Sequence, residues 1–283
     1  NKVIKQVYIR FCFFQLFVIS FLLSCSTSKD KFLNKEYHKL NSKYNVIFNA
    51  EQALTFGEIL IDKSNEEDFG KIVSVEPLGL LDENLERPQK IPSFTLAEEK
   101  ATKAIQKHSM NVDGKERNPI MDQAYLLLGK ARYYDNRFIP ALEAFNYILY
   151  KYPTSEYINK VKIWKEKINI RLDQNKYAID NLKELLEEEN LLIEERSLAN
   201  SYLAQAFINI EQIDSAAYFL KKSNQQFKNI KNNPRNTFLL AQLYQELKVK
   251  DTASELYSEI IDLHRKIPRK FYINSYINKS SIS

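Results

Sequence analysis

The sequence predicts an all-α fold, a solenoid of stacked helical hairpins that follows a cleaved signal peptide. Three observations predict it. First, alanines at helix-packing positions recur at spacings of 37, 38 and 37 residues. Second, the 283 residues include 17 Tyr and 17 Phe but only 5 Gly, whereas most all-β folds need glycine at many turns. Third, the first 24 residues place basic residues before an apolar run, which is typical of export signals.

Residues 1–24 form the predicted signal peptide. Lys2, Lys5 and Arg10 precede an apolar run over residues 11–23, which is too short for a comfortable membrane span. The run ends in Leu-Leu-Ser-Cys at residues 22–25, an order that resembles the bacterial lipobox. We therefore expect cleavage before Cys25 and lipidation of its sulfur, which would anchor the chain to a membrane. The alternative is an ordinary signal peptide or a short anchor with a chance cysteine.

Removal of the signal changes the charge balance. The chain carries 41 basic and 36 acidic residues, and residues 1–24 hold three basic and no acidic ones, so 38 basic residues face 36 acidic ones afterwards. A net charge of +2 on an exported protein argues against nucleic-acid binding. Cys12 leaves with the signal, so no free thiol remains once Cys25 is lipidated.

The sequence offers no catalytic, cofactor or metal motif, so we expect a protein that is not an enzyme. His38, His108 and His264 share no ligand spacing, and each is interpreted as a helix-surface histidine. The acidic run at residues 187–189 is interpreted as a solvated helix end. Trp164 falls on the apolar phase of its helix and is expected in the core.

Residues 25–62 are predicted to form an N-terminal helical hairpin. Its first helix would cover residues 32–49 and its second residues 51–62. The apolar residues of the first helix are spaced by three and four, which predicts that they face the core: Leu33, Tyr37, Leu40, Tyr44 and Phe48. Residues 63–92, with three prolines and two glycines, are predicted to be a loop or linker.

Residues 93–283 are predicted to be helical repeats. Thr95 and Glu98 predict a capping box that opens a helix ending near His108, and residues 109–119 a second loop. The clearest repeat unit, residues 122–155, is similar to a tetratricopeptide repeat. Its small residues, Gly129 and Ala141, would lie where two helices approach closely.

In later units the packing alanines are Ala178, Ala216 and Ala253, with a divergent hairpin around Trp164. This regularity favours a tetratricopeptide-like solenoid over an irregular bundle. A last helical pattern starts near Ile273 without a partner, so we expect the sequence to be a piece of a longer protein.

A solenoid of this kind has a concave wall, which is the candidate partner-binding surface. First-helix residues that face away from the hairpin core would line it: Lys130, Tyr133, Tyr134, Gln205, Asn209, Gln242 and Glu246. Some tetratricopeptide proteins use Lys and Asn here to bind a C-terminal carboxylate. Only Lys130 and Asn209 would contribute, from non-adjacent units, which argues against binding of a free C-terminus, and an extended groove for another protein remains open.

Two further segments carry a family resemblance: residues 25–49 (CSTSKDKFLNKEYHKLNSKYNVIFN) and 97–118 (AEEKATKAIQKHSMNVDGKERN). With the first repeat, they resemble the start of the SprE/PorW family, tetratricopeptide lipoproteins of Bacteroidota. The resemblance implies a part of the type IX secretion system and of gliding motility, lipid-anchored at the periplasmic face of the outer membrane. It also implies partners: a PorN/GldN-like component of the periplasmic ring and the outer-membrane translocon.

Two other functions remain open on the sequence. One is a general periplasmic tetratricopeptide lipoprotein for outer-membrane assembly or nutrient uptake, built on the same repeats. The other is an enzyme whose catalytic domain lies beyond residue 283.

Overall fold

The structure is a computed structural model, and it describes residues 27–77, 91–227 and 233–282. The predicted signal peptide and Cys25 lie outside these residues. In the described ranges, no helix is both long enough and apolar enough to cross a membrane.

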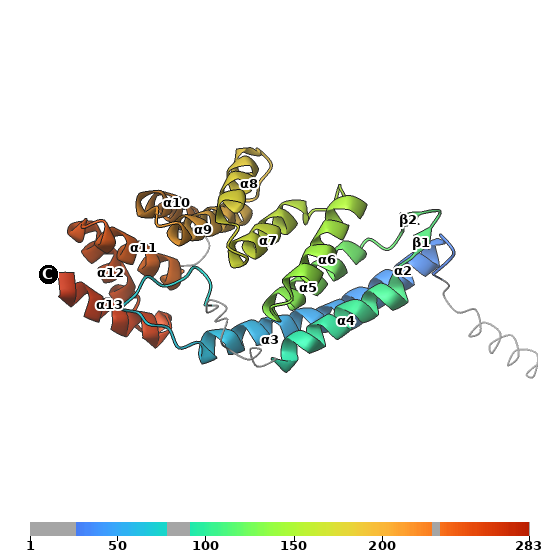
Figure 1. Cartoon of the computed structure of the whole chain (residues 1–283). Helices are drawn as coiled ribbons and strands as arrows, with labels where there is room; N and C mark the ends of the chain where they lie inside the picture. The colour runs from blue at the N-terminus through green and yellow to red at the C-terminus, as the bar shows by residue number, and fades with distance from the viewer. Residues whose placement is uncertain (1–26, 78–90, 228–232, 283) are drawn as a thin grey trace, which may run out of the picture.

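Four consecutive helical hairpins build most of the chain, and they stack side by side into a curved solenoid (Figure 1). The pairs are α5 (Met121–Tyr134) with α6 (Phe138–Lys151), α7 (Ile158–Arg171) with α8 (Asn175–Glu187), α9 (Ile193–Asn209) with α10 (Ile213–Phe227), and α11 (Pro234–Glu246) with α12 (Lys250–Leu263). A short 3₁₀ turn, η2 (His264–Lys266), leads to α13 (Arg269–Ile282), which packs on α12. The predicted all-α repeat fold is confirmed.

The hairpins pack on the small residues that the sequence marks. The side chains of Ala141, Ala178, Ala216 and Ala253 are all fully buried, at 0% exposure. A Cβ atom added to Gly129 would collide with the ring of Phe145 across the α5–α6 contact, so glycine is required there. The repeat period therefore reflects a steric limit on how closely two helices pack.

The predicted N-terminal hairpin is wrong, because residues 32–64 form one continuous helix. It consists of α2 (Phe32–Asn41), a π-helical turn η1 (Ser42–Ile47) and α3 (Phe48–Ser64), and the joining residues keep helical backbone angles. Its partner is α4 (Pro92–His108), and Figure 1 shows the two helices running side by side. Gly57 packs against the ring of Phe94 at this contact.

The long helix also buries a different face from the predicted one. The five residues expected in the core are exposed, from 49% for Tyr37 to 74% for Leu33. The buried face instead carries smaller side chains: His38, Ser42, Val46, Ile47, Ala50, Ala53 and Leu54. They match the alanine-rich face of α4, which lets the two helices approach closely.

Two local expectations before the repeats also change. Helix α4 begins at Pro92, so Thr95 lies inside the helix and forms no cap. Glu98 instead pairs with Arg132 and Arg137. Residues 109–119, expected as a loop, contain two short antiparallel strands, β1 (Asn111–Val112) and β2 (Lys115–Glu116).

The long helix connects the two ends of the described solenoid. In the last turn of α3, Asp62 accepts from the Lys270 ammonium of α13 through its carbonyl oxygen at 3.0 Å and through its carboxylate at 2.8 Å. The first described helix thus touches the last one, 208 residues further along the chain. This contact joins the two ends of the curved solenoid. The residues that follow α3 then run along its concave side.

A concave groove occupied by the chain's own segment

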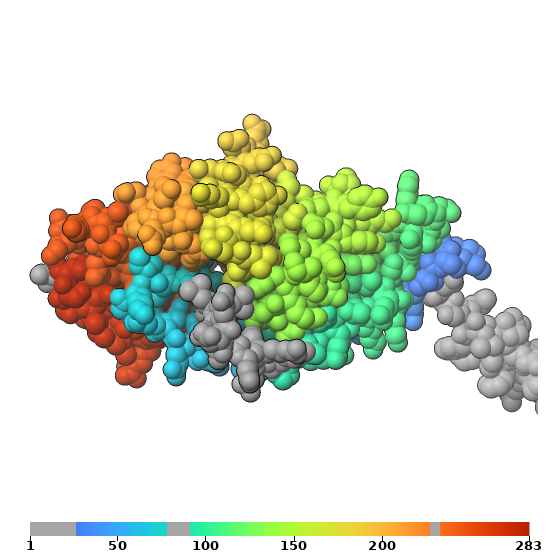
Figure 2. All heavy atoms as spheres, viewed as in Figure 1, coloured from blue at the N-terminus to red at the C-terminus, as the bar shows by residue number. Residues whose placement is uncertain are grey.

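An extended segment that follows α3 occupies the concave side of the solenoid. We call residues 65–77 the groove segment. Figure 2 shows it, in cyan, seated in a hollow between the C-terminal and the middle repeats. Val73 at its centre is 5% exposed and belongs to the apolar core of the last three hairpins. The groove segment is therefore an internal ligand of the concave wall.

Two glutamines of the concave wall bind the main chain of the groove segment. Gln242 accepts the Val73 N–H at 2.9 Å and donates to the carbonyl oxygens of Phe69 and Lys71 at 3.1 and 2.6 Å. One repeat earlier, Gln205 accepts the Val75 N–H at 2.8 Å. Side-chain amides thus supply the hydrogen bonds that strand pairing would give an extended backbone, with little dependence on its sequence.

Near its first anchoring carboxylate, Glu67, the groove segment is bound through its side chains and no longer only through its main chain. Arg235 of α11 binds the Glu67 carboxylate through two parallel bonds of 2.6 Å each, and the two side chains are 9% and 11% exposed. The same guanidinium donates to the Ser74 carbonyl oxygen at 3.0 Å. Phe69 then inserts edge-on between Phe238 and Phe271. The Arg235 guanidinium favours a carboxylate, and the pocket between Phe238 and Phe271 favours an aromatic side chain that follows it in the sequence.

The other acidic end, Glu76, meets a buried lysine in an aromatic cage. Its carboxylate accepts from the Lys167 ammonium at 2.8 Å, from Tyr133 at 2.7 Å and from Tyr134 at 3.1 Å. The Lys167 side chain is only 3% exposed. Its nitrogen lies 3.5 Å from the ring centre of Trp164, with further rings at 4.7, 4.8 and 5.6 Å that belong to Tyr133, Tyr202 and Tyr134.

This cage fixes the charge states of its members. Burial by itself raises the pKa of Glu76, but the Lys167 ammonium and the two tyrosine hydroxyls together hold it below its usual value. Burial and the Glu76 carboxylate raise the pKa of Tyr133 and Tyr134 well above their usual value. The tyrosines therefore stay protonated as donors, and the carboxylate stays ionised at neutral pH.

The residues predicted for the concave face divide into two groups. Tyr133, Tyr134, Gln205 and Gln242 contact the groove segment directly. Among the described residues, no hydrogen bond joins the groove segment to the other three, Lys130, Asn209 and Glu246.

Each residue of the second group has a different setting. Lys130 lies over the Trp164 ring at 5.1 Å, and burial together with the nearby Lys160 lowers the pKa of Lys130 to about 8. Asn209 bonds Asn175 and Gln205, whereas Glu246 is exposed. In the described part of the chain, Lys130 and Asn209 therefore do not meet to form one site that could bind a carboxylate.

Sequence reasoning missed the two cations that anchor the groove segment. Lys167 follows Trp164 and precedes Ile168, inside the apolar phase of α7, and Arg235 is the second residue of α11. A lysine within an apolar phase was a usable signal, because such a charge needs a partner. Trp164 is 6% exposed, as expected of a core residue, and it also forms one wall of the lysine cage.

Two of the three histidines are not the isolated surface residues that the sequence suggested. His38 is 4% exposed, and its Nδ1 lies 3.0 Å from the Nδ1 of His108 where α2 packs on α4. Burial, then the nearby His38, Lys107 and Lys103, lowers the pKa of His108. The pair is a contact between helices, and no third metal ligand joins it among the described residues.

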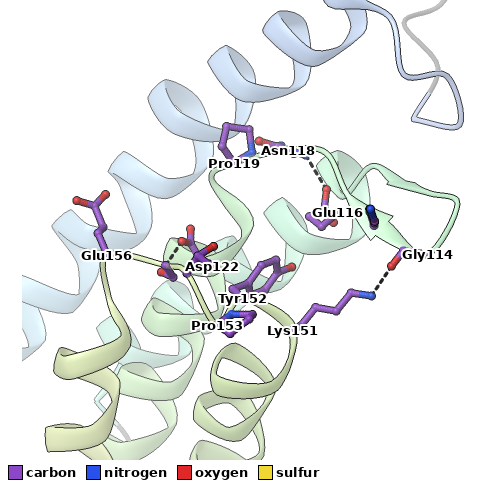
Figure 3. A pocket seen from close by; sticks show the side chains of 12 residues that line it. Gly114, Glu116, Asn118, Pro119, Asp122, Lys151, Tyr152, Pro153 and Glu156 are labelled. Atoms are coloured by element: carbon purple, nitrogen blue, oxygen red, sulfur yellow. Dashed lines mark hydrogen bonds between the residues drawn. The ribbon is translucent and has the colours of Figure 1, made fainter. Parts of the chain in front are cut away.

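A cleft of about 470 Å³ lies between the β-hairpin and the end of α6 (Figure 3). Three of its charged side chains already have partners. Lys151 donates to the Gly114 carbonyl oxygen at 2.6 Å, and Asp122 accepts from Ser155 at 2.6 Å. Glu116 accepts main-chain N–H groups at 2.7 and 2.8 Å. These contacts brace the loop and leave the concave groove as the better candidate site.

Comparison with known proteins supports the fold. No protein-family model matches the chain, and no curated protein matches it. Among solved structures, that of yeast Tom70, a tetratricopeptide-repeat protein, superposes with a TM-score of 0.54 at 16% sequence identity. The match covers 90% of this chain and 44% of the Tom70 chain, so this chain spans less than half of that one. A tetratricopeptide-like solenoid fold is thereby shown.

Proposed function

We propose that the chain is a non-enzymatic adaptor that binds other proteins through extended segments. The observation that carries this is the groove segment itself. Six side chains from four helices of the concave wall bind an extended backbone and two of its carboxylates: Tyr133, Tyr134, Lys167, Gln205, Arg235 and Gln242. A wall that binds polypeptide in this way has the chemistry of a peptide-recognition surface.

The setting that we propose is the periplasmic face of the outer membrane, in type IX protein secretion and gliding motility. The support is the likeness of residues 25–49 and 97–118 to the SprE/PorW family, together with the lipobox before Cys25. In this setting the adaptor would link a PorN/GldN-like ring component to the outer-membrane translocon. The solenoid would supply the binding surface, and the lipid on Cys25 would hold it at the membrane.

Membrane anchoring is tested by Cys25→Ala, with Cys12→Ala as the matched control. We expect Cys25→Ala to lose signal cleavage and lipid labelling, and its chain to leave the outer-membrane fraction. Cys12→Ala should keep the wild-type distribution, because Cys12 is removed with the signal. A Cys25→Ala chain that is still cleaved and lipid-labelled would contradict the lipoprotein proposal.

The adaptor role is tested by cross-linking and mass spectrometry on outer membranes that contain the wild-type chain. We expect cross-links from the solenoid to ring and translocon components of the secretion machinery. Cross-links only to assembly factors or uptake receptors would instead favour a general periplasmic lipoprotein. The absence of any protein cross-link to the concave side would count against the adaptor role itself.

A further inference from the structure

The groove segment differs from a helix or strand in the partners of its main-chain hydrogen bonds. In helices and sheets, main-chain groups bond one another, but here the N–H groups of Val73 and Val75 bond glutamine side chains. Within the segment, the N–H groups of Gly70 and Lys71 make short-range hydrogen bonds to Asp68. Its conformation is thus set by the groove, as for a bound peptide.

The groove cannot favourably stay empty. Arg235 is 9% exposed and Lys167 is 3% exposed, and each is paired with a carboxylate of the segment. If the segment left, both cations would lie in a largely apolar wall without these partners, which is strongly unfavourable. An occupant that replaces the segment must therefore bring two carboxylates to the same places.

The spacing of the contacts defines that occupant. The two carboxylates, Glu67 and Glu76, are nine residues apart, which allows at most about 30 Å of extended chain. Phe69 fills the aromatic pocket two residues after the first carboxylate. Val73 and Val75 fill the apolar floor before the second one.

We propose that the concave groove binds, in trans, an extended acidic segment of a partner protein with this same arrangement, and that residues 65–77 occupy the groove until the partner segment displaces them. The inference rests on the adaptor function proposed above and adds the chemistry of the ligand and the competition that controls access. The ligand is an extended peptide with an acidic residue, an aromatic residue two positions later and a second acidic residue nine positions after the first.

The test uses the full chain and a fluorescent peptide of residues 65–77, NEEDFGKIVSVEP. A disengaged variant carries Glu67→Gln, Phe69→Ala and Glu76→Gln, which removes the anchors of the segment but leaves the groove intact. We expect the disengaged variant to bind the peptide at least ten-fold more tightly than the wild-type chain, at one peptide per chain. A peptide with Glu67 and Glu76 changed to glutamine should lose at least ten-fold in affinity.

Two controls separate the groove from general charge effects. A chain with Glu143→Gln and Glu255→Gln, two exposed carboxylates on α6 and α12, should bind the peptide as weakly as wild type. Adding Arg235→Gln to the disengaged variant should abolish the gain. A folded disengaged variant that binds no peptide, or a wild-type chain that binds equally well, would overturn the proposal.

A second measurement keeps the proposal testable if the disengaged variant does not fold. Hydrogen exchange on the wild-type chain should show faster exchange at the Val73 and Val75 amides when the peptide is in excess. Unchanged exchange at saturating peptide would overturn the displacement. If peptide binding fails but cross-links to secretion components remain, the adaptor function stands and this ligand assignment falls.

Discussion

Lys167 is stabilised by two kinds of interaction that respond differently to substitution. The aromatic rings of its cage attract the ammonium through cation–π interactions. Glu76 accepts a hydrogen bond from the ammonium and supplies the compensating negative charge. Since both groups are largely buried, the pair adds little beyond an apolar pair of similar size. Removing one member, however, leaves the other charge without its counter-charge.

Glu76→Gln is expected to lower the free energy of unfolding, or of groove-segment opening, by about 3 kcal/mol. Glutamine can still accept from the two tyrosines, so the loss reports on the missing charge opposite Lys167. The double variant Glu76→Leu with Lys167→Met should recover most of that loss. Denaturant unfolding and amide exchange of the segment measure both. Equal losses in the single and double variants would contradict this account.

His108 makes the α2–α4 contact sensitive to pH. Its pKa in the folded chain is lowered from 6.5, chiefly by burial, so the unfolded chain binds the proton more readily. The stability that depends on neutral His108 is therefore complete above about pH 6.5 and is lost as the pH falls below it. The difference in unfolding midpoint between pH 7.5 and pH 5.5 should shrink in His108→Gln.

His264→Gln is the matched control for this prediction, because His264 is exposed on η2. It should keep the pH dependence of the wild-type chain. If His108→Gln also keeps it, the acid sensitivity comes from other groups.

Four hairpin turns share one backbone conformation, and this is the structural counterpart of the alanine period. Asn136, Asp173, Glu211 and Lys248 all have positive φ, between 56° and 61°. Their own N–H donates three residues back, and the next N–H donates five residues back, which defines a Schellman motif. They recur at 37, 38 and 37 residues, so turn and core share a period.

Glycine is the usual residue at this turn position, and its absence here explains part of the low glycine count. Lys248→Gly is expected to raise the free energy of unfolding by about 0.5–1 kcal/mol, because glycine carries no penalty at positive φ. Asn136→Gly should gain less, since asparagine tolerates this conformation well. Thermal and denaturant unfolding compare the two, and a loss of stability in Lys248→Gly would contradict the expectation.

The elements that sequence reasoning predicts well are those whose packing is local. The hairpins fall in this class, because Gly129 meets Phe145 only sixteen residues later. Residues 32–64 have apolar side chains on two faces, and only the packing with α4 decides that Val46 is buried and Tyr44 exposed. Periodicity alone had no means of making that choice.

At the scale of the whole molecule, the groove depends on contacts between distant parts of the chain. Four of the seven residues predicted for the concave face contact the groove segment, because a solenoid exposes first-helix positions on its inner wall. Their ligand could not, since Gln242 and Val73 are 169 residues apart and nothing local to either specifies the pairing. Lys167 and Arg235 were missed for the same reason, because the carboxylates that justify them lie elsewhere in the sequence.

The closed groove has a consequence for the order of folding. A solenoid forms by short-range contacts and can grow one hairpin at a time. The groove segment is synthesised before every hairpin that binds it, and its bonds to Arg235 and Gln242 await the fourth hairpin. We therefore expect docking of the segment to follow the rate-limiting step of folding.

The variant Glu67→Gln tests whether the groove segment docks late in folding. We expect it to leave the refolding rate constant unchanged and to raise the unfolding rate constant, as for a contact absent from the transition state. Stopped-flow refolding and unfolding at a series of denaturant concentrations measure the two rate constants separately. Because the segment is synthesised before the groove that binds it, a partner segment would always meet a groove whose own segment is already tethered to it.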